Sequence, residues 1–323
     1  MKKNDSLGKI AEIIGEADSV LIFPHILMDG DAMGSATALC MALRNMGKEA
    51  WVLLEDKIAD YLAFMDNGCC THKQDIIASP DISLCIDCGE TGRFPNRTEA
   101  FEKGRTKICI DHHKTSDPFC DYNHIDSSSA ATGELVYLLL REMGAEFTAQ
   151  ICESLFAAIT TDTGNFQYSN TTIRSHEITV ALMKEGVDVN KVSVELYENE
   201  KPEKFRLHNM VMDTMEIFAE GKAVIAYVTR DMIKKSKALM EDTEGLVSAL
   251  RSLRGIQIAM LLKENSDGSY KVTMRAKTQG DVAAIASRYD GGGHTKAAGC
   301  TINDSLENAM KIMKREAEKQ LDQ

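Results

Sequence analysis

Short apolar runs alternate with longer helix-forming segments between Ser19 and about Gly186, and this alternation restricts the fold more than any other feature of the sequence. Each run is compact and rich in β-branched or aliphatic residues, which is typical of strands. Strands that alternate with helices form an open, mostly parallel sheet whose faces are covered by helices. We therefore expect an α/β fold with strands at Ser19–Phe23, Glu49–Leu54, Ile82–Ile86 and Lys107–Ile110.

Four helices are expected in the same region from apolar spacing and from capping and stop signals. Ser and Thr residues before two of the segments are candidate N-caps, because a hydroxyl group accepts from the free N–H groups of a first helical turn. The expected helices are Asp31–Met46, followed by Gly47; a helix capped by Ser129 that runs through Met143; Ala149–Thr160; and a helix capped by Thr172 that ends at Gly186.

A chain of 323 residues is long enough for two domains of about 150 residues each. Residues 188–220 look helical and polar, so we expect a connector there between a first domain of residues 1–187 and a second of residues 221–323. The second domain is expected to be a smaller α/β unit with a hairpin turn at residues 264–269. Its expected strands are Lys222–Val228, Ile256–Leu262 and Lys271–Ala276, and its helices Asp231–Leu239, Thr243–Leu253, Asp281–Tyr289 and one from Asp304.

The charge balance and composition argue against several classes of protein. Acidic residues outnumber basic ones by 49 to 37, and a net charge of -12 disfavours a protein that coats long nucleic acid. The sequence has no apolar run long enough for a membrane span and no apolar core of a secretion signal after Met1. Nine cysteines are an odd number that needs no disulfide framework, so we expect a cytoplasmic protein.

Carboxylates and imidazoles follow three of the expected strands directly. Parallel strands bring their carboxyl ends to one edge of a sheet, which is where open α/β sheets bind ligands. Taken singly, Asp29 or Asp31 could cap the next helix and His112 could be an interior histidine. Taken together, the side chains form one group: His25, Asp29 and Asp31 after the first strand, Asp87 after the third, Asp111, His112 and His113 after the fourth, and Asp162 where a later helix gives way to a loop.

So many carboxylates at one edge would repel one another unless cations lay among them. Carboxylates mixed with neutral imidazoles suit manganese, iron or another borderline divalent ion. The group holds too many ligands for one ion, so two ions that share an aspartate are the simplest arrangement. Such a pair of ions is the usual apparatus for displacement at phosphorus.

Four motifs in this order resemble those of the DHH phosphoesterases, a family named after its Asp-His-His triplet. They are His25-x-x-x-Asp29-Gly30-Asp31-x-x-Gly34-Ser35, Asp87, Asp111-His112-His113 and Thr161-Asp162-Thr163-Gly164. The tail, Asp290-Gly291-Gly292-Gly293-His294-Thr295-Lys296-Ala297-Ala298-Gly299, resembles the associated DHHA1 domain. The chain is most similar to the bacterial nanoRNase and pAp-phosphatase branch, which includes cyclic-dinucleotide phosphodiesterases. Met28 stands where relatives often have Pro, and Asp290 where they commonly have Gly.

The resemblance implies a catalytic DHH domain with a two-manganese site and, across a cleft, a substrate-binding DHHA1 domain. It assigns His25, Asp29 and Asp87 to the first ion and Asp31, Asp87, His112 and Asp162 to the second, with Asp87 bridging. By the same resemblance, His113 faces the substrate phosphate and Asp111 orients the histidines. Both are therefore predicted to be catalytic residues.

The glycine-rich tail is expected to form a small cationic pocket. Successive glycines let backbone N–H groups approach an anion closely. Arg275, Gly292, Gly293 and His294 are the expected substrate-binding residues, and Arg275 could offer a bidentate fork to phosphate. A flexible turn with solvated charges is the alternative, and the sequence leaves open whether Lys277 and Lys296 contribute.

We expect a hydrolase in which a hydroxide activated by two metal ions cleaves short nucleotides: nanoRNA, dinucleotides such as pApA or pGpG, and 3′-phosphoadenosine 5′-phosphate. Alternatives are a cyclic-di-AMP phosphodiesterase, an inorganic pyrophosphatase or polyphosphatase, an exonuclease for longer strands, and a binding scaffold without turnover. One tryptophan and 6% aromatic residues make extended single-strand binding weak. The expected partner is a short oligoribonucleotide or dinucleotide, with neither long nucleic acid nor membrane, and a homodimer is compatible with the resemblance.

Overall fold

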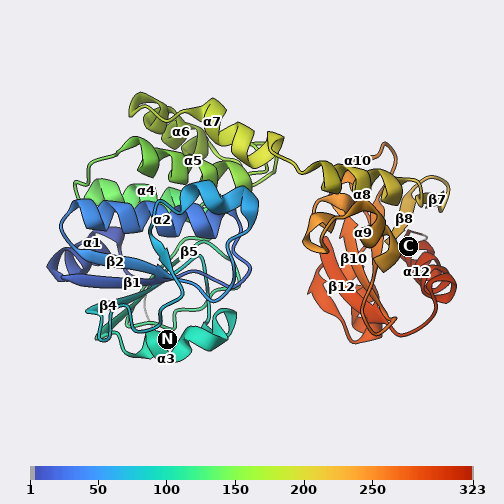
Figure 1. The fold of residues 1–323 in the computed structure, drawn as a ribbon, viewed down its shortest axis with the longest axis horizontal. Coiled ribbons are helices and arrows are strands. Elements are labelled where there is room, and N and C mark those ends of the chain that lie inside the picture. The colour runs from blue at the N-terminus through green and yellow to red at the C-terminus, as the bar shows by residue number, and fades with distance from the viewer. Residues whose placement is uncertain (1–3, 322–323) are drawn as a thin grey trace. The chain divides into compact units, whose positions relative to one another are not determined.

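The chain folds into two compact units, and the boundary between them along the sequence lies between Asn199 and Glu200. Each unit contains one sheet covered by helices (Figure 1). The computed structural model describes residues 4–321. Within that range, every helix is too short or too polar to span a bilayer.

The sheet of unit 1 consists of six parallel strands in the order β3-β2-β1-β4-β5-β6. Its strands are β1 (Ser19–Phe23), β2 (Glu49–Leu53), β3 (Cys70–Thr71), β4 (Ile82–Ile86), β5 (Thr106–Asp111) and β6 (Tyr122–Ile125). The predicted α/β class with a mostly parallel sheet is confirmed. The strand order reverses between β1 and β4, and such a reversal opens a crevice at the carboxyl ends of the two strands.

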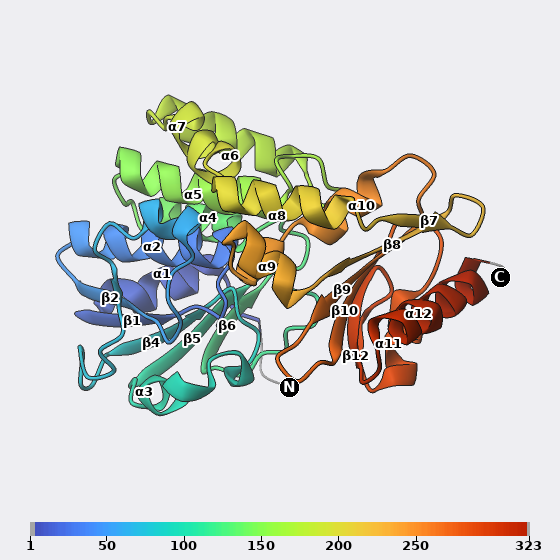
Figure 2. The same cartoon turned by 45° about the vertical axis from the view of Figure 1, so that its right-hand side comes forward.

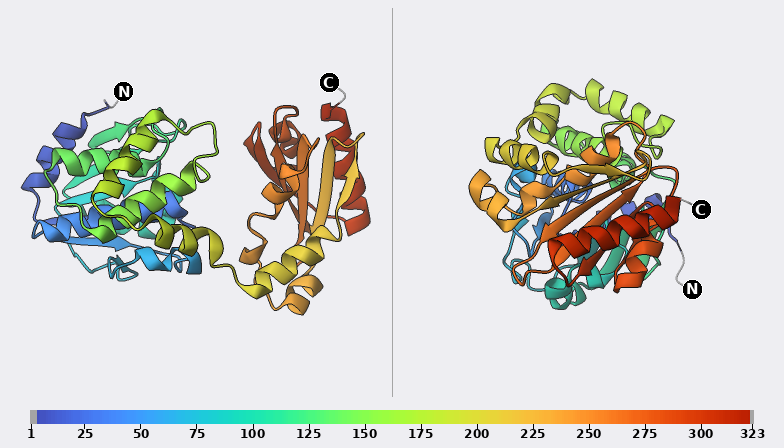
Figure 3. Two further views of the ribbon diagram at one scale, coloured as in Figure 1. Left: turned by 90° about the horizontal axis from the view of Figure 1, so that it is seen from above. Right: turned by 90° about the vertical axis from the view of Figure 1, so that its right-hand side faces the viewer.

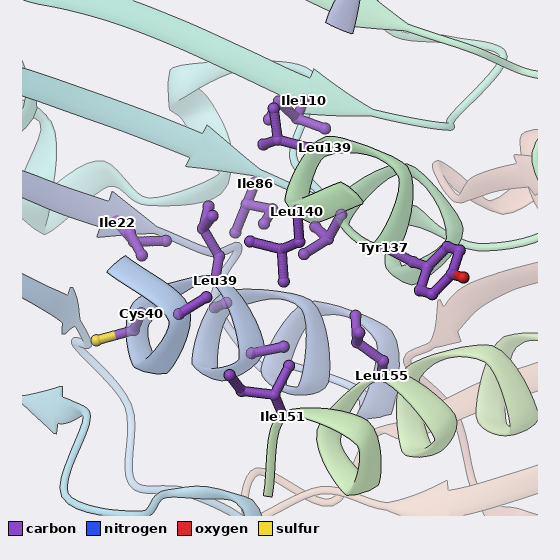
Figure 4. Packing of buried hydrophobic residues seen from close by; sticks show 14 of the residues in the cluster. Ile22, Leu39, Cys40, Ile86, Ile110, Tyr137, Leu139, Leu140, Ile151 and Leu155 are labelled. Carbon is purple, nitrogen blue, oxygen red and sulfur yellow. The ribbon is translucent and has the colours of Figure 1, made fainter. Parts of the chain in front are cut away.

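The helices of unit 1 lie on both faces of this sheet (Figure 1). They are α1 (Leu7–Glu16), α2 (Gly30–Asn45), α3 (Thr98–Glu102), α4 (Thr132–Glu142), α5 (Ala149–Asp162), α6 (Ile173–Lys184) and α7 (Val189–Ser193), with short turns at Asp60–Met65, Thr91–Arg93, Pro95–Arg97 and Val194–Glu198. The first face is covered by α2 and α4, with α5 packed on them. Figure 4 shows Leu39 and Leu140 close to Ile22 and Ile86 of the strands, whereas Leu155 of α5 lies farther from these two residues.

The opposite face of the sheet is covered by a smaller cluster. Phe94 and Phe101 of the segment around α3 pack against Phe23 of β1, with ring centroids 5.1–5.7 Å apart. Both faces of β1 and β4 are therefore buried, which explains why their sequences are continuous apolar runs rather than alternating ones.

The sequence prediction differs from unit 1 at several places, and the helices α1 and α3 are among the elements that it did not include. Ser129 does not cap α4, because Ala131 stands at the cap position and the Ser129 hydroxyl instead donates to Ala131 O and to Glu134. Two strands, β3 and β6, were not predicted. Both are short edge strands that carry polar residues, so they lack the apolar run by which the central strands were recognised.

Unit 2 contains a six-stranded mixed sheet in the order β11-β12-β10-β9-β8-β7, in which only β8 and β9 run parallel. Its strands are β7 (Glu216–Phe218), β8 (Ala223–Val228), β9 (Ile258–Glu264), β10 (Tyr270–Ala276), β11 (Gly292–His294) and β12 (Ala297–Ile302). Its helices are α8 (Pro202–Met212), α9 (Arg230–Ser236), α10 (Leu246–Ser252), α11 (Val282–Ala286) and α12 (Leu306–Leu321), with short turns at Glu241–Thr243 and Ser287–Tyr289.

The two faces of this second sheet are covered differently. One face packs against α11 and α12, which lie across it in the right-hand view of Figure 3. The other face packs against α8, α9 and α10 over β8 and β9, and Figure 2 shows α8 and α9 on the side of the sheet away from α12. On β10, β11 and β12 the residues of this second face are exposed or half-buried, so part of the face is open: Lys271, Thr273, Arg275, Gly292, His294, Ala297, Gly299 and Thr301.

Candidate active site

The predicted cluster in unit 1 forms at the carboxyl ends of β1, β4 and β5, where the strand order reverses. His25 follows β1, Asp87 follows β4, and Asp111 is the last residue of β5. The first turn of α2 supplies Asp31, and Asp162 is the last residue of α5. These side chains come together in three groups of possible metal ligands, namely His25, Asp29 and Asp87; Asp31, His112 and Asp162; and Asp87, His112 and His113.

Asp87 lies between two histidines and turns a different oxygen toward each. Its Oδ2 is 3.6 Å from His25 Nε2, and its Oδ1 is 3.7 Å from His112 Nε2. Asp87 is 2% exposed and has a left-handed φ of 52°, which an aspartate adopts at a cost. Its N–H donates to Ile110 O at 3.0 Å, so the adjacent strand holds this conformation in place.

The distances from the two histidines to the surrounding carboxylates are too long for hydrogen bonds and lie in a narrow range. His25 Nε2 lies 3.8 Å from Asp29 Oδ1, and His112 Nε2 lies 3.6 Å from both Asp31 Oδ2 and Asp162 Oδ2. Two ligand atoms that are each about 2.1 Å from one ion lie roughly 3–4 Å apart. The donor set therefore fits divalent cations between these atoms.

Backbone carbonyls set the orientation of both histidines. His25 Nδ1 lies 2.7 Å from Ile26 O, and His112 Nδ1 lies 3.2 Å from Ser129 O. Because a carbonyl only accepts, each Nδ1 carries a proton and Nε2 is the nitrogen that faces the carboxylates. Burial acts to lower the pKa of His25, but the neighbouring carboxylates of Asp29 and Asp87 raise it to about 10. A metal ion would displace the Nε2 proton and leave the tautomer that a metal-binding histidine needs.

Asp31 is almost fully buried and is held by the N-terminus of α4. Its carboxylate accepts hydrogen bonds from the N–H groups of Thr132 (2.7 Å) and Gly133 (2.9 Å) and from the Ser35 hydroxyl (3.1 Å). Even so, burial and repulsion from Asp87 and other carboxylates raise the pKa of Asp31 well above its ordinary value. The pocket thus lacks positive charge where Asp31 lies.

Asp162 shows the same shortage of positive charge. Burial raises the pKa of its carboxyl to about 6, with His112 acting in the opposite direction and Asp87 adding to the effect. The loop that follows is strained at Asn165 and Phe166, whose φ values are 56° and 62°, whereas Gly164 takes its positive φ readily. Hydrogen bonds from Asn165 N to Thr160 O and from Phe166 N to the Thr163 hydroxyl fix this loop.

His113 is the more exposed member of the histidine pair, with 45% of its side chain accessible. Its Nδ1 lies 2.7 Å from Asp111 Oδ1, and this hydrogen bond is the main reason that the pKa of His113 rises to about 9. Asp111 is buried, which would raise its pKa, but His113 and Ser116 donate to it and lower the pKa instead. Asp111 therefore orients His113 so that Nε2 is the nitrogen left for a ligand.

Asp29 has two roles in the structure. Its side chain caps α2 by accepting from Ala32 N at 3.0 Å, as the structural alternative predicted, and it also lies in the group with His25 and Asp87. Sequence reasoning missed Thr132, whose hydroxyl donates to Asp87 Oδ1 at 2.7 Å. A Thr-Gly pair at a helix start was the only signal in the sequence.

In unit 2, the predicted residues of the tail lie on neighbouring strands rather than around a turn. Gly292–His294 form β11, which pairs with β12. Ala297 is directly opposite His294 on one side and Arg275 on the other, so His294 and Arg275 flank a small residue on the same face of the sheet. That face carries the open region described above.

The glycines of the tail are explained largely by strand packing. A Cβ at Gly291 would lie 2.3 Å from Gly299 O, and one at Gly293 would lie 2.4 Å from Ala297 O. Gly292 has open space around it. Asp290 adopts the left-handed conformation, with φ 52°, which glycine takes readily and aspartate tolerates. The aspartate therefore leaves the turn intact.

Lys277 and Lys296 point to other parts of unit 2. Lys277 Nζ donates to Leu253 O at 2.8 Å, and Lys296 Nζ donates to Thr278 O at 2.8 Å. Both ammonium groups thus hold loops together by binding backbone carbonyls, which answers the question that the sequence left open.

Two family models match the chain. Residues 19–159 match the N-terminal domain of the DHH family, and residues 220–320 match the DHHA1 domain. Among curated proteins, the bifunctional oligoribonuclease and PAP phosphatase NrnA of Thermus thermophilus is 30% identical over 302 residues, which cover 91% of this chain and 87% of the relative. NrnA of Bacillus subtilis is 24% identical and covers 88% of this chain and 90% of its own length.

More distant relatives extend the comparison. The cyclic-di-AMP phosphodiesterase PdeA of Listeria monocytogenes is 22% identical over 97% of this chain, but the match spans 48% of that protein. An exopolyphosphatase-related protein from Bacteroides fragilis has the same fold, with a TM-score of 0.90 and 23% identity over 97% of this chain and 95% of its own.

Proposed function

Because the chain belongs to the DHH family and also carries a DHHA1 domain, we propose that it hydrolyses short nucleotide substrates at a two-metal centre in unit 1. The chain is a hydrolase of phosphoester bonds, and the proposed substrates are nanoRNA, dinucleotides such as pApA or pGpG, and 3′-phosphoadenosine 5′-phosphate. The supporting observation is that Asp87 turns one oxygen toward His25 and the other toward His112. That arrangement suits two cations that share one carboxylate.

The proposed ligands are His25, Asp29 and Asp87 for one ion and Asp31, Asp87, His112 and Asp162 for the other, with manganese as the metal that suits this mixture of carboxylate and imidazole. Such ions supply positive charge opposite the phosphoryl oxygens and make a water acidic enough to attack phosphorus. Their charge would also offset the repulsion that raises the pKa values of Asp31 and Asp162.

The protein's own groups have separate tasks in this scheme. Asp111 accepts from His113 Nδ1, so His113 Nε2 is directed to a phosphoryl oxygen of the substrate, where it stabilises developing negative charge. The N-terminus of α4 and the Thr132 hydroxyl keep Asp31 and Asp87 in place. Fixed orientation matters because donors that need no reorganisation contribute most to the rate.

Unit 2 is proposed to bind the part of the substrate that does not react. Arg275 and His294 flank Ala297 on the open face, and Gly292 and Gly293 lie on the edge strand beside it. A guanidinium with a neighbouring imidazole suits a phosphate or a nucleotide end. This assignment keeps residues 1–187 as the catalytic domain, 188–220 as the connecting segment and 221–323 as the substrate-binding domain. Within the connecting segment, residues up to 199 pack with unit 1 and residues from 200 pack with unit 2.

The hydrolysis of a substrate panel tests the proposal. Protein stripped of metal and reloaded with Mn²⁺ is offered pApA, pGpG, 3′-phosphoadenosine 5′-phosphate, cyclic di-AMP and pyrophosphate, and products are separated by chromatography. We expect the linear dinucleotides to be cleaved fastest. Fastest turnover of cyclic di-AMP would favour the cyclic-dinucleotide alternative, and turnover of pyrophosphate alone would contradict the proposal.

The cellular setting is also part of the proposal. All nine cysteines carry free thiols, and eight of them are buried, which suits a reducing cytoplasm. A short nucleotide fits the net charge of -12 better than long nucleic acid does. Sedimentation of the purified protein tests the homodimer that the resemblance allows.

A further inference from the structure

Two lysines lie opposite each other at the border of the open region in unit 2: Lys271 is exposed, whereas Lys263 is half-buried. Lys263 of β9 is directly opposite Lys271 of β10 in the antiparallel pair. Like charges at directly opposite positions destabilise a sheet. Such a pair is unexpected in a chain with an excess of acidic residues, and it therefore calls for an explanation.

Neither lysine has a carboxylate partner among residues 4–321 that would neutralise it. Lys263 Nζ is 3.3 Å from the Thr243 hydroxyl, and no ion pair forms with either ammonium group. Burial and the charge of Lys271 lower the pKa of Lys263, and the carboxylate of Glu244, which forms no ion pair with it, acts in the opposite direction without reversing the shift. An anion between the two side chains would remove the repulsion.

The lysine pair lies on the same face as Arg275 and His294. Residues 271, 273 and 275 of β10 alternate with the buried residues Val272 and Met274, so Lys271 and Arg275 point to the same side. Across β12, Thr301 is opposite Lys271 and Ala297 is opposite Arg275. Between the two cationic positions, the same face carries Thr273 of β10 and, opposite it, Gly299 of β12.

The two positions are too far apart to share one phosphate. Four residues along β10 separate Lys271 from Arg275, a distance of about 13 Å at the rise of an antiparallel strand. A ligand that contacts both must therefore carry at least two anionic groups on one chain. A linear nucleotide chain has phosphates at regular intervals, and its sugars can pass over Ala297 and Gly299.

Building on the function proposed above, we propose that Lys263 and Lys271 form a second phosphate subsite of unit 2, which binds an additional phosphate of oligonucleotides longer than a dinucleotide. Arg275 and His294 hold one phosphate, and the lysine pair holds another phosphate of the same chain. The site thereby favours chains of several nucleotides over dinucleotides in binding.

Binding of short RNA tests this subsite without hydrolysis. The full chain is titrated in EDTA with fluorescently labelled, 5′-phosphorylated oligoadenylates of two and five nucleotides, and anisotropy is measured at several salt concentrations. The variants are Lys263→Gln, Lys271→Gln and, as the matched control, Lys311→Gln, whose exposed side chain lies on α12 at the opposite face. Thermal unfolding verifies that each variant is folded.

We expect Lys263→Gln and Lys271→Gln each to lower the ratio of pentanucleotide to dinucleotide affinity severalfold. Each should also make the slope of the logarithm of the pentanucleotide association constant against the logarithm of the salt concentration shallower by about 0.7. Lys311→Gln should leave both quantities as in the wild type. Equal ratios and slopes in all four proteins would overturn the subsite. Inorganic tripolyphosphate, added as a competitor, should displace the pentanucleotide only weakly. Equal affinity for tripolyphosphate and the pentanucleotide would overturn the proposal that the subsite binds a nucleotide chain.

The result for the lysine subsite can be distinguished from the result for the proposed hydrolytic function. If the wild type cleaves no nucleotide in Mn²⁺, the hydrolytic assignment fails, whereas the binding ratios in EDTA still decide on the subsite. If dinucleotides are cleaved and Lys263→Gln and Lys271→Gln both bind like the wild type, only the subsite is wrong.

Discussion

The Thr132 hydroxyl donates a 2.7 Å hydrogen bond to Oδ1 of Asp87, the oxygen that faces His112. Thr132 is also the first residue of α4, and its N–H donates to Asp31. One residue thus connects two of the carboxylates that come from different strands and helices, and it does so from a fully buried position.

Replacing Thr132 by Val should weaken the binding of Mn²⁺ by about 10–100-fold, because Asp87 loses the donor that fixes its orientation. Thr132→Ser keeps the hydroxyl and should restore most of the affinity. Isothermal titration of metal into the apo protein measures the effect. Thr37→Val, which removes another buried helical hydroxyl, is the control and should change stability but not metal affinity; equal losses in both variants would argue for a general structural effect.

Asp87→Asn should abolish the shared site. Turnover should fall by more than about 100-fold, beyond what the loss of a supporting hydrogen bond causes. In the metal-free state the variant should melt no earlier than the wild type, since one of the carboxylates that repel Asp31 has lost its charge. Differential scanning calorimetry with and without Mn²⁺ checks this, with Asp213→Asn, an exposed aspartate of unit 2, as the control. Metal-induced stabilisation equal to that of the wild type would contradict the bridging role.

Gly34→Ala should destabilise unit 1 by about 1–3 kcal/mol. The added Cβ would lie 2.3 Å from Ser154 O, so α2 and α5 would have to separate. Asp162 at the end of α5 would move with them, and activity should fall as well. Urea unfolding measures the free energy. Gly15→Ala on α1 meets no atom within 4 Å and should instead stabilise by about 0.5–1 kcal/mol; similar destabilisation by both changes would refute the packing argument.

Acid should weaken the loop before α4. Partial burial acts to raise the pKa of Asp126, but hydrogen bonds from Ser128 and the nearby Arg174 outweigh it, and the pKa lies below its ordinary value. The stabilisation from this group is therefore present above about pH 4 and is lost as the pH falls through the lowered pKa. Asp126→Asn should flatten the dependence of the free energy of unfolding on pH in that acidic range. Near neutral pH, the curves of the wild type and the variant should run parallel. An unchanged slope in acid would show that Asp126 contributes nothing there.

Arg275→Ala should raise KM severalfold with little change in kcat, because a group that binds the non-reacting end stabilises ground and transition states alike. Steady-state kinetics on pApA separates the two constants. A loss confined to kcat would place Arg275 at the reacting phosphate instead.

The central strands and the residues that follow them could be predicted from the sequence. β1, β4 and β5 are buried, so their apolar runs are unbroken, and His25, Asp87 and the Asp-His-His triplet stand at the points where those runs end. The grouping of these side chains then follows from parallel pairing alone.

What escaped prediction depends on contacts between distant segments. Whether Thr132 reaches Asp87 depends on where α4 begins and how it packs, and local propensity does not decide either. β11 was missed because a run of glycines is typical of turns, whereas here Gly293 is needed to let two strands approach. The Lys263 and Lys271 pair became visible only through strand register.

The order of the chain has a consequence for maturation. His25 follows the first strand of the sheet and Asp162 ends α5, so a nascent polypeptide emerging from the ribosome cannot complete the cluster until most of unit 1 has been synthesised. Long-range parallel pairing is also slow to form. Metal capture must therefore come late, after folding has closed the sheet, and growth conditions that deplete the cation should yield a folded but inactive precursor that is activated by adding the ion back.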